Sequence, residues 1–427
     1  MVMETTTLID AVKKMYPVHM FFKNRYFPDG KVYYSEKALI EMKEGGKDIA
    51  PFVIPVSGGI PMKKQGYRAF EVKAPYIAPT MPITADDLEK KAFGESPESG
   101  RTPEDREDEV QAECMDEMRG AIERRKEKMC IDILTTGRVL MKHYATGNDA
   151  AKDKNAQEMI LQFYDEEGGF QNKFQLQKEF SSMSERDKMQ LIYDMAMELN
   201  GRGVKATDLI LTKDVGPDFF LDKDVLEYFN IRRVDFGSMK PEELPDGVMS
   251  IGVYNISGIA LTIFIYDNNY KDLDGTEKEF LPKGTIAMLK PAMGTTVYSQ
   301  VTLVAKEGGF SSYAAPIVPR VVYDTKNNMA EVQMFSRPVP YPYDRKGWLV
   351  ANIYDKVSES DISEPDSQEE DSLSFKSTEE INAMTKAQLL EYGESIGVEG
   401  LTSSMLVDEI RAAILDYQAE VEDGVGA

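Results

Sequence analysis

The residues best suited to catalysis or metal binding are few and scattered. The two histidines, His19 and His143, lie far apart, and neither belongs to a spacing that holds a metal ion. The two cysteines, Cys114 and Cys130, fall sixteen residues apart on one predicted helix, which keeps them from meeting within one chain. We therefore expect reduced thiols, a reducing compartment and no zinc site.

Two short motifs resemble ligand-binding loops. Gly201 to Ala206 matches Gly-x-Gly-x-x-Ala, but a dinucleotide fingerprint needs a strand before it and a helix after it, and here the predicted order is reversed. The run Asp272 to Gly275 resembles part of a calcium loop, yet its register places Tyr270 and Leu281 at the first and last ligand positions. An Asp-Gly hairpin turn is the better interpretation, and a loose surface ion site is the alternative.

The sequence contains no Gly-x-Ser-x-Gly elbow and no Walker A motif. Carboxylates are so abundant that no particular pair stands out. We therefore predict that the chain is not an enzyme, with no catalytic, cofactor-binding or metal-binding residue and no cofactor.

Length and charge set further bounds. The chain has 427 residues, a length that is enough for two or three compact domains. It is 42% hydrophobic, so a sizeable core can form, and it carries a net charge of −23. Residues 355–427 hold 19 acidic and 4 basic side chains, so the rest of the chain is only mildly acidic. The sequence contains no stripe of basic residues that could bind along a nucleic-acid phosphate backbone. It also contains no apolar run that is long enough to cross a membrane. We expect neither specific nucleic-acid binding nor a membrane partner.

A long charged helix is the strongest structural signal. Thr102 is the predicted N-cap, with Pro103 at the first helical position and Asp105 at the third, and the helix is expected to run to about Thr136. Acidic residues precede basic ones along it, which complements the helix dipole. A narrow apolar stripe consists of Val110, Cys114, Met118, Ile122, Met129 and Ile133. A solvated helix or a coiled coil is the alternative, although no heptad is sustained.

A two-stranded hairpin is predicted just before this helix. Phe52, Ile54 and Val56 occupy alternating positions of the first predicted strand. Phe70 and Val72 occupy alternating positions of the second strand, which follows a Gly-Gly turn. The other face of the hairpin carries lysine and arginine instead of a second apolar set. Because a lone two-stranded arm is marginal in water, we expect the arm and the rod-like helix to need the surface of a partner. The first dozen residues show no clear period and are expected to be mobile unless a neighbour holds them.

The middle of the chain has the pattern of an α+β fold. A second helix is predicted from the cap Ser184 to Asn200–Gly201, followed by a buried strand at 207–212 and a short helix from Gly216. Antiparallel strands follow at 249–254, at 259–266 and up to Leu289. Trp348, in a last strand, is predicted to be a core anchor.

Several of these segments, in this order, resemble the major capsid protein E family of tailed bacteriophages, typified by phage lambda. The segments are Ile49–Val53, Gly66–Tyr67, Ala78–Thr80 with Ile83, Asp86–Leu88, Phe93–Glu95 and Arg124–Arg125 with Leu134–Gly137. The similarity covers roughly residues 15–354. It implies the tailed-phage major capsid fold, with an extended loop lying over a neighbouring subunit, a spine helix, a peripheral domain and an axial domain that meets its fellows around five- and six-fold axes.

This resemblance divides the chain into seven parts. The expected parts are an N-terminal arm (1–48), an extended hairpin loop (49–84), a peripheral domain with the spine helix (85–180), an axial domain (181–325), a return strand of the peripheral domain (326–356), an acidic disordered linker (357–377) and a C-terminal module (378–422). The module has a helix capped by Thr385 and Gln388 and a second helix with Ile410 and Ile414. It is similar to helix-extension-helix modules related to LEM and SAP domains, but its 11 acidic and 2 basic residues in 378–423 favour protein docking over DNA contact.

The resemblance implies a major capsid protein that self-assembles into the icosahedral head shell enclosing phage DNA. The implied partners are other copies of the chain in pentamers and hexamers, scaffold and portal proteins, possible decoration proteins and packaged double-stranded DNA bound non-specifically. The implied location is the virion, with assembly in the host cytoplasm. Two alternatives are an encapsulin-like compartment shell, which resembles the same fold, and a binding protein that recruits a partner through its C-terminal module.

Overall fold

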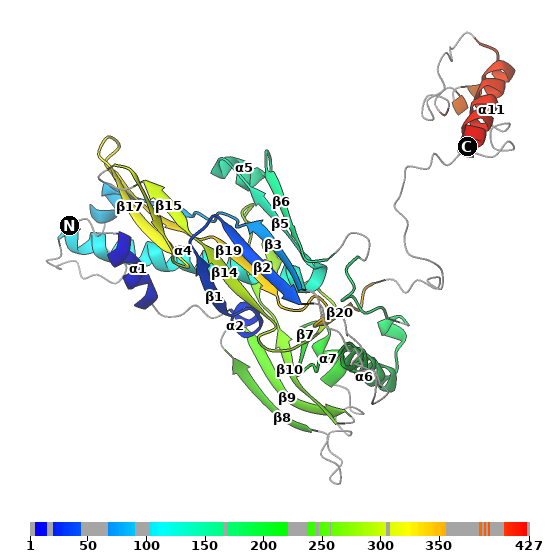
Figure 1. Cartoon of the computed structure of the whole chain (residues 1–427), viewed down its shortest axis with the longest axis horizontal. Coiled ribbons are helices and arrows are strands. Elements are labelled where there is room, and N and C mark those ends of the chain that lie inside the picture. Colours follow the sequence, from blue (N-terminus) through cyan, green and yellow to red (C-terminus); the bar gives the residue numbers. More distant parts are fainter. Residues whose placement is uncertain are drawn as a thin grey trace, which may run out of the picture. The chain divides into compact units, whose positions relative to one another are not determined.

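The computed structural model divides into two units, residues 1–357 and 358–427, and each is described by itself (Figure 1). The structure describes residues 5–14, 20–43, 67–89, 102–164, 169–176, 178–220, 237–244, 247–256, 258–304, 308–355, 384–386, 388–389, 392 and 405–424.

The central element of the first unit is the helix α4 (Pro103–Thr136), as the end signals predict. The Thr102 hydroxyl accepts the backbone N–H of Asp105, and the Asp105 carboxylate accepts the N–H of Thr102, so both halves of the capping box are present. Gly137 ends the helix in the left-handed conformation, and its N–H donates to the carbonyl of Ile133. The predicted helix and its cap are confirmed.

The chain's own sheets cover one face of α4 along much of its length. Met118 and Ile122 are buried in one hydrophobic cluster, whereas Met129, Ile133 and Leu134 belong to the main core. The expectation that this rod is left without support by its own chain is therefore wrong. The apolar stripe buries itself within the subunit, and only the opposite, charged face remains exposed.

A three-stranded antiparallel sheet, in the order β17-β18-β4, packs on the first half of α4 (Figure 1). Its strands are β4 (Thr80–Thr84), β17 (Val318–Asp324) and β18 (Met329–Phe335), and the short helix α3 (Ala85–Glu89) follows β4. The helix α1 (Thr5–Lys14) lies against β17 and buries Leu8 and Val12. The sequence analysis found no clear period in this segment, but the four-residue spacing of Leu8 and Val12 gives it one apolar face, which β17 covers.

A second three-stranded sheet, in the order β1-β14-β19, lies beside the second half of α4 (Figure 1). It contains β1 (Asp29–Tyr33), β14 (Gly294–Ser299) and β19 (Pro338–Pro342), and the short helix α2 (Phe21–Tyr26) leads into it. Two antiparallel ribbons stand next to these sheets. They are β5 (Arg138–His143) with β6 (Gln157–Gln162), joined through α5 (Gly147–Lys152), and β15 (Val301–Val304) with β16 (Phe310–Tyr313).

The six-stranded sheet has the order β20-β13-β7-β10-β9-β8. Its strands are β7 (Asp208–Thr212), β8 (Gly237–Leu244), β9 (Val248–Ile256), β10 (Ile259–Tyr266), β13 (Thr285–Leu289) and β20 (Leu349–Asn352). The helices α6 (Glu185–Arg202) and α7 (Gly216–Phe220) pack with it, and η2 (Phe180–Ser182) precedes α6. The predicted strands at 207–212, 249–254 and 259–266 are confirmed, and the chain has the predicted α+β class. Residues 221–236, where the predicted helix from Gly216 would continue, lie outside the described part.

The predicted division of the first unit into an arm, a peripheral domain and an axial domain stays a prediction. The strand pairings cross its boundaries. β20, from the predicted return segment 326–356, pairs antiparallel with β13 in the six-stranded sheet. β14 and β17, from the predicted axial span 181–325, pair with β1, β19 and β18 outside that sheet.

The ribbon of β2 (Lys37–Lys43) and β3 (Tyr67–Lys73) occupies the position expected for the extended hairpin. The described partner of β3 is β2, in an antiparallel register that pairs Lys43 with Tyr67, so the ribbon begins well before residue 49. Residues 44–66, including the predicted strand at Phe52–Val56, lie outside the described residues. Ala38, Ile40 and Met42 are buried in the main core, so the chain itself supports the base of this arm.

Trp348 is the anchor that the sequence predicts. Its ring is 1% exposed, and its indole N–H donates to the Leu134 carbonyl near the end of α4 at 2.9 Å. Phe170 lies 6.4 Å away, centroid to centroid. The last turn of the long helix is thereby fixed to the segment that enters β20.

Replacing Gly137 by alanine is expected to destabilise the first unit by about 2–3 kcal/mol. Gly137 has φ 68°, and an added Cβ would lie 2.5 Å from the Phe170 ring and 2.8 Å from the Tyr164 ring. The measurement is the midpoint of the main thermal transition. Gly201→Ala is the matched control, because nothing lies within 4 Å of its Cβ position inside α6, and that change is expected to be neutral or stabilising. Equal midpoints for both variants would contradict the packing around Gly137.

The second unit is a small cluster of helical residues. Leu389, Tyr392, Ile410 and Ile414 are buried together, the last two on α11 (Val407–Gly424). The amide and hydroxyl of Thr385 both donate to the Gln388 side-chain oxygen, as the predicted cap requires. The predicted likeness to LEM and SAP modules stays a prediction.

Candidate functional site

The residues singled out for chemistry do not come together. His143 lies on β5, His19 is outside the described residues, and Cys114 and Cys130 are free thiols, the second fully buried. Within the described residues, no three His, Cys, Asp or Glu side chains are placed to hold a metal ion. In the same part of the chain, no helix is sufficiently long and apolar to traverse a bilayer.

The two motif interpretations are confirmed. Gly203 ends α6 in the left-handed conformation and β7 follows, so the glycine motif is a helix terminus. Asp272 and Asp274 lie in the turn between β11 (Asn269–Lys271) and β12 (Glu277–Glu279), where their carboxylates contact Lys278. This is a hairpin turn whose carboxylates already have a cationic neighbour.

The polar centre of the first unit lies where residues 20–33, here termed the N-terminal strap, cross α4. The Glu127 carboxylate, which is fully buried, accepts the backbone N–H groups of Phe22 at 2.9 Å and Lys23 at 2.7 Å, and the Tyr266 hydroxyl at 3.3 Å. One side chain of α4 therefore satisfies the first amides of α2, which would otherwise be buried without partners.

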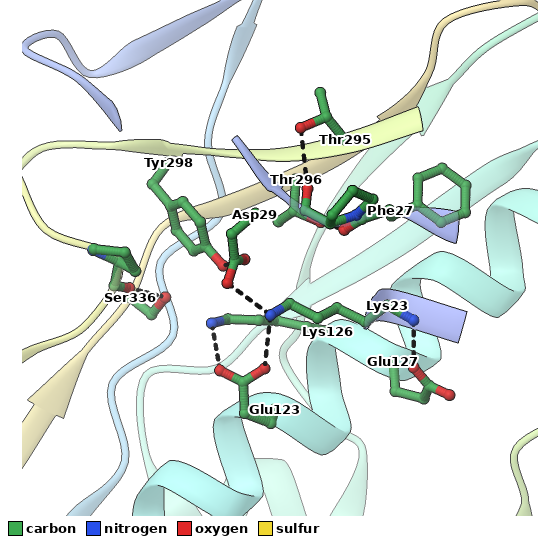
Figure 2. Close-up of polar contacts among 12 residues, drawn as sticks. Lys23, Phe27, Asp29, Glu123, Lys126, Glu127, Thr295, Thr296, Tyr298 and Ser336 are labelled. Atoms are coloured by element: carbon green, nitrogen blue, oxygen red, sulfur yellow. Dashed lines mark hydrogen bonds and ion pairs between the residues drawn. The ribbon is translucent and has the colours of Figure 1, made fainter. Parts of the chain in front are cut away.

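A closed ring of contacts lies next to Glu127 (Figure 2). Lys23 Nζ is 2.8 Å from Asp29 Oδ2 and 3.6 Å from Glu123 Oε2, and Lys126 Nζ is 2.8 Å from Glu123 Oε1. Tyr298 donates its hydroxyl hydrogen to Asp29, and Lys126 lies 4.8 Å from the centre of the Tyr298 ring. The ring joins the N-terminal strap, α4 and β14, three elements far apart in sequence.

The pKa values of the two lysines of the ring shift in opposite directions. Burial acts to lower the pKa of Lys23, but Glu123 and Asp29 outweigh it and raise the pKa above its ordinary 10.5. Burial lowers the pKa of Lys126 below 10.5, although Glu123 acts in the opposite direction. For Asp29, burial acts to raise the pKa, but the Lys23 ammonium and the hydrogen bonds from Lys23 and Tyr298 hold it below 3.8.

A second polar contact fixes the same strap to the six-stranded sheet. Asp208, at the start of β7 and 1% exposed, accepts hydrogen bonds from Arg25 Nε at 2.5 Å and from the Tyr26 hydroxyl at 2.8 Å. Burial and the adjacent Asp208 raise the pKa of Tyr26 well above 10.0, so this phenol stays protonated and remains a donor. The two centres determine the position of the N-terminal strap between α4 and both sheets.

The carboxylates of Glu127, Asp29 and Asp208 accept hydrogen bonds from donors of the same chain. The Glu123 carboxylate forms ion pairs with Lys126 and Lys23. What the arrangement does is fix the relative position of α4, the strap and the sheets. The sequence analysis missed both centres. The only local signal was that Glu123, Lys126 and Glu127 belong to a charged run between Ile122 and Met129 of the apolar stripe of α4.

The Asp29 pKa gives a pH-dependence prediction. A depressed folded-state pKa contributes stability at pH values above 3.8, and this contribution is lost as the pH falls from 3.8 through the folded-state pKa. The full chain is therefore expected to be more stable than Asp29→Asn at pH 7, by a margin that shrinks below pH 3.8. Urea unfolding of both proteins across that range measures the margin, and a margin that does not change with pH would contradict the ion pair.

The surface carries several apolar side chains on its ribbons. Leu140 and Ile160 face each other across β5 and β6 and are 48% and 56% exposed. Val304 and Phe310 pair at the end of β15 and β16 and are 57% and 80% exposed. Such paired apolar side chains on exposed ribbons are suited to contact with another protein surface.

Comparison with known families identifies the chain. The sequence profile of the phage major capsid protein E family matches residues 4–352. The chain belongs to this family. It is thus a capsid protein, a structural subunit of a phage head shell. No protein in the curated set that was compared matches it.

The chain is also similar to several solved structures. The capsid protein is similar to a prophage capsid protein from E. coli CFT073, at 17% identity and a TM-score of 0.54, over 82% of this chain and 99% of that one. The capsid of cyanophage P-SCSP1u gives 6% identity and a TM-score of 0.43, over 79% and 89% of the two chains. The SrpI encapsulin of Synechococcus elongatus PCC 7942 gives 8% and 0.39, over 86% and 100%. The first comparison supports the tailed-phage capsid fold.

Proposed function

We propose that this capsid protein assembles into pentamers and hexamers that close into an icosahedral shell around double-stranded phage DNA. The observation that carries the proposal is the family match over residues 4–352, which covers nearly all of the first unit. The likeness to a prophage capsid protein over 82% of the chain supports it. The exposed apolar pairs on the β5–β6 and β15–β16 ribbons provide surfaces suited to contact between copies.

In this proposal each structural part of the chain has its own role in the shell. The ribbon β2–β3 carries residues 44–66 toward a neighbouring copy, and α4 sets the length of the subunit. The six-stranded sheet with α6 and α7 forms the part around the five- and six-fold axes. No catalytic step is involved, and the shell gains its stability from weak contacts repeated between many copies.

The proposal also concerns the partners of the shell. Scaffold and portal proteins meet it during assembly in the host cytoplasm, and decoration proteins are possible later partners. Contact with DNA is non-specific, because outside residues 355–427 the chain carries 54 acidic and 46 basic side chains and has no basic stripe. The second unit, with its acidic linker, is proposed to dock a protein partner rather than DNA.

Size-exclusion chromatography with light scattering tests self-association directly. The purified chain, 48.1 kDa, is expected to elute at masses of five or six copies and of larger particles. A single 48.1 kDa species at every concentration up to about 100 μM would contradict the proposal, because repeated weak contacts must become populated in that range.

A further inference from the structure

The β2–β3 ribbon reaches the body of the first unit mainly through β2. That strand contacts β14 and β19 and buries Ala38, Ile40 and Met42 (Figure 1). β2 and β3 form a two-stranded antiparallel sheet, so β3 is joined to the body mainly by way of its neighbour. The direction in which the whole ribbon leaves the body therefore depends on what holds its two ends.

Arg337 contacts both ends of this ribbon at once. The two ends, here termed the roots, are Glu36, just before β2, and Ala74, just after β3. Arg337 Nη2 lies 3.4 Å from Glu36 Oε1 and donates to the Ala74 carbonyl at 3.3 Å. Arg337 Nη1 donates to the carbonyl of Gln300, between β14 and β15, at 3.4 Å. One side chain from the β18–β19 connection thus joins the outgoing and the returning root to the body.

The returning chain is also fixed directly to the β18–β19 connection. The Ile77 N–H donates to the Ser336 carbonyl at 3.0 Å, and the Ser336 N–H donates to the Ile77 carbonyl at 2.9 Å. The Tyr76 ring lies 5.7 Å from the Phe335 ring, centroid to centroid, and Arg337 Cζ lies 5.8 Å from the centre of the Tyr76 ring. Arg337 therefore extends an existing attachment of the returning chain to the outgoing root as well.

The Arg337 contacts differ from those of an ordinary surface ion pair. The Arg337 side chain is 12% exposed, so solvent screens its contacts less than those of a surface pair. Its planar guanidinium donates in two directions, which the single ammonium of a lysine cannot reproduce. Lys37 and Glu71, by contrast, pair within the ribbon with both side chains more than 60% exposed. That pair joins strand to strand, whereas Arg337 joins the ribbon to the body.

We infer that Arg337 is a positioning residue that sets the direction of the β2–β3 ribbon, so that residues 44–66 are presented to a neighbouring copy in one orientation. The buried face of β2 holds the ribbon on the body, and Arg337 fixes its roots. A ribbon with one direction binds more tightly than a ribbon with many, because less orientational freedom is lost on contact. The inference rests on the proposed self-assembly through this ribbon and names the residue that aligns it.

Spin-label distances in the unassembled subunit test the direction of the ribbon. In a chain with Cys114→Ser, labels are placed at E41C on β2 and M197C on α6, both exposed positions, while the buried Cys130 stays unlabelled. R337Q and R337K are each expected to broaden the distance distribution about twofold, because neither side chain contacts both roots. K37Q is the matched control and should leave the distribution unchanged. A distribution in R337Q as narrow as in the unaltered chain would overturn the inference.

A second variant keeps the test decisive if R337Q does not fold. Glu36 is exposed, so E36Q is expected to fold, and it removes the contact of Arg337 with the outgoing root. Its control is K73Q, because Lys73 Nζ lies 3.0 Å from the same Glu36 oxygen but belongs to the ribbon itself. E36Q is expected to broaden the distances more than K73Q, and equal widths would contradict the role of Arg337.

Assembly of the same variants separates this inference from the proposed function. R337Q is expected to raise the concentration needed for shell formation about tenfold, whereas K37Q should stay within about twofold of the unaltered chain. Thermal unfolding of each variant below the assembly concentration distinguishes a folding defect from a misaligned ribbon. R337Q that assembles like the unaltered chain would overturn the inference but leave the proposed function intact. An unaltered chain that forms no shells would contradict the proposed function itself.

Discussion

Glu127→Ala is expected to lower the free energy of unfolding of the first unit by about 3–5 kcal/mol. The carboxylate is fully buried and accepts the amides of Phe22 and Lys23 together with the Tyr266 hydroxyl. Removing it leaves two backbone N–H groups without their carboxylate acceptor in a region where water cannot replace it. Urea denaturation of the first unit's main transition measures the loss.

Two variants sharpen this test. Glu127→Gln keeps one carbonyl oxygen and should fall between alanine and the unaltered chain. Glu113→Ala removes an exposed carboxylate from the same helix and should change stability by less than about 0.5 kcal/mol. If Glu127→Ala were as mild as Glu113→Ala, the amides of α2 would have to find other acceptors, and the N-terminal strap would not depend on α4.

Deleting residues 57–66 is expected to abolish shell formation while leaving a folded, soluble subunit. Folding should survive because the base of the β2–β3 ribbon packs on the chain's own core through Ala38, Ile40 and Met42. Assembly should fail because the segment proposed to reach a neighbouring copy is removed. Circular dichroism and thermal unfolding check the fold, and electron microscopy of particles checks assembly.

A deletion of the same length provides the control. Removing residues 361–370 shortens the acidic linker, which lies beyond the family match at 4–352 and outside the first unit, so shells should still form. Normal particles from the 57–66 deletion would show that assembly does not need this loop. Loss of particles from both deletions would mean that length alone, not the loop, is limiting.

Local signals in the sequence predicted the two long helices α4 and α6 and several strands of the six-stranded sheet. The caps at Thr102 and Ser184 each depend on a few neighbouring residues, and the structure has both capping boxes. Alternating or continuous apolar runs are also local signals, and they correctly predicted β7, β9 and β10. Trp348 was identified as an anchor because one large aromatic residue in an apolar strand is most stable when buried.

Features decided by long-range pairing were missed. The partner of β3 is β2, and β20 joins β13, although nothing near either strand specifies which edge it meets. The ring around Lys23 joins residues about one hundred positions apart, so its members look like ordinary surface charges in the sequence. α1 was also missed, because ten residues give too few turns for a clear period.

The central claim is that copies of this chain close into a shell, and electron microscopy of the purified full-length protein tests it most directly. The account predicts closed, uniform particles with five- and six-fold clusters of subunits in their walls. A folded protein that stays as separate subunits in every field, at concentrations high enough to populate the contacts between copies, would contradict this claim.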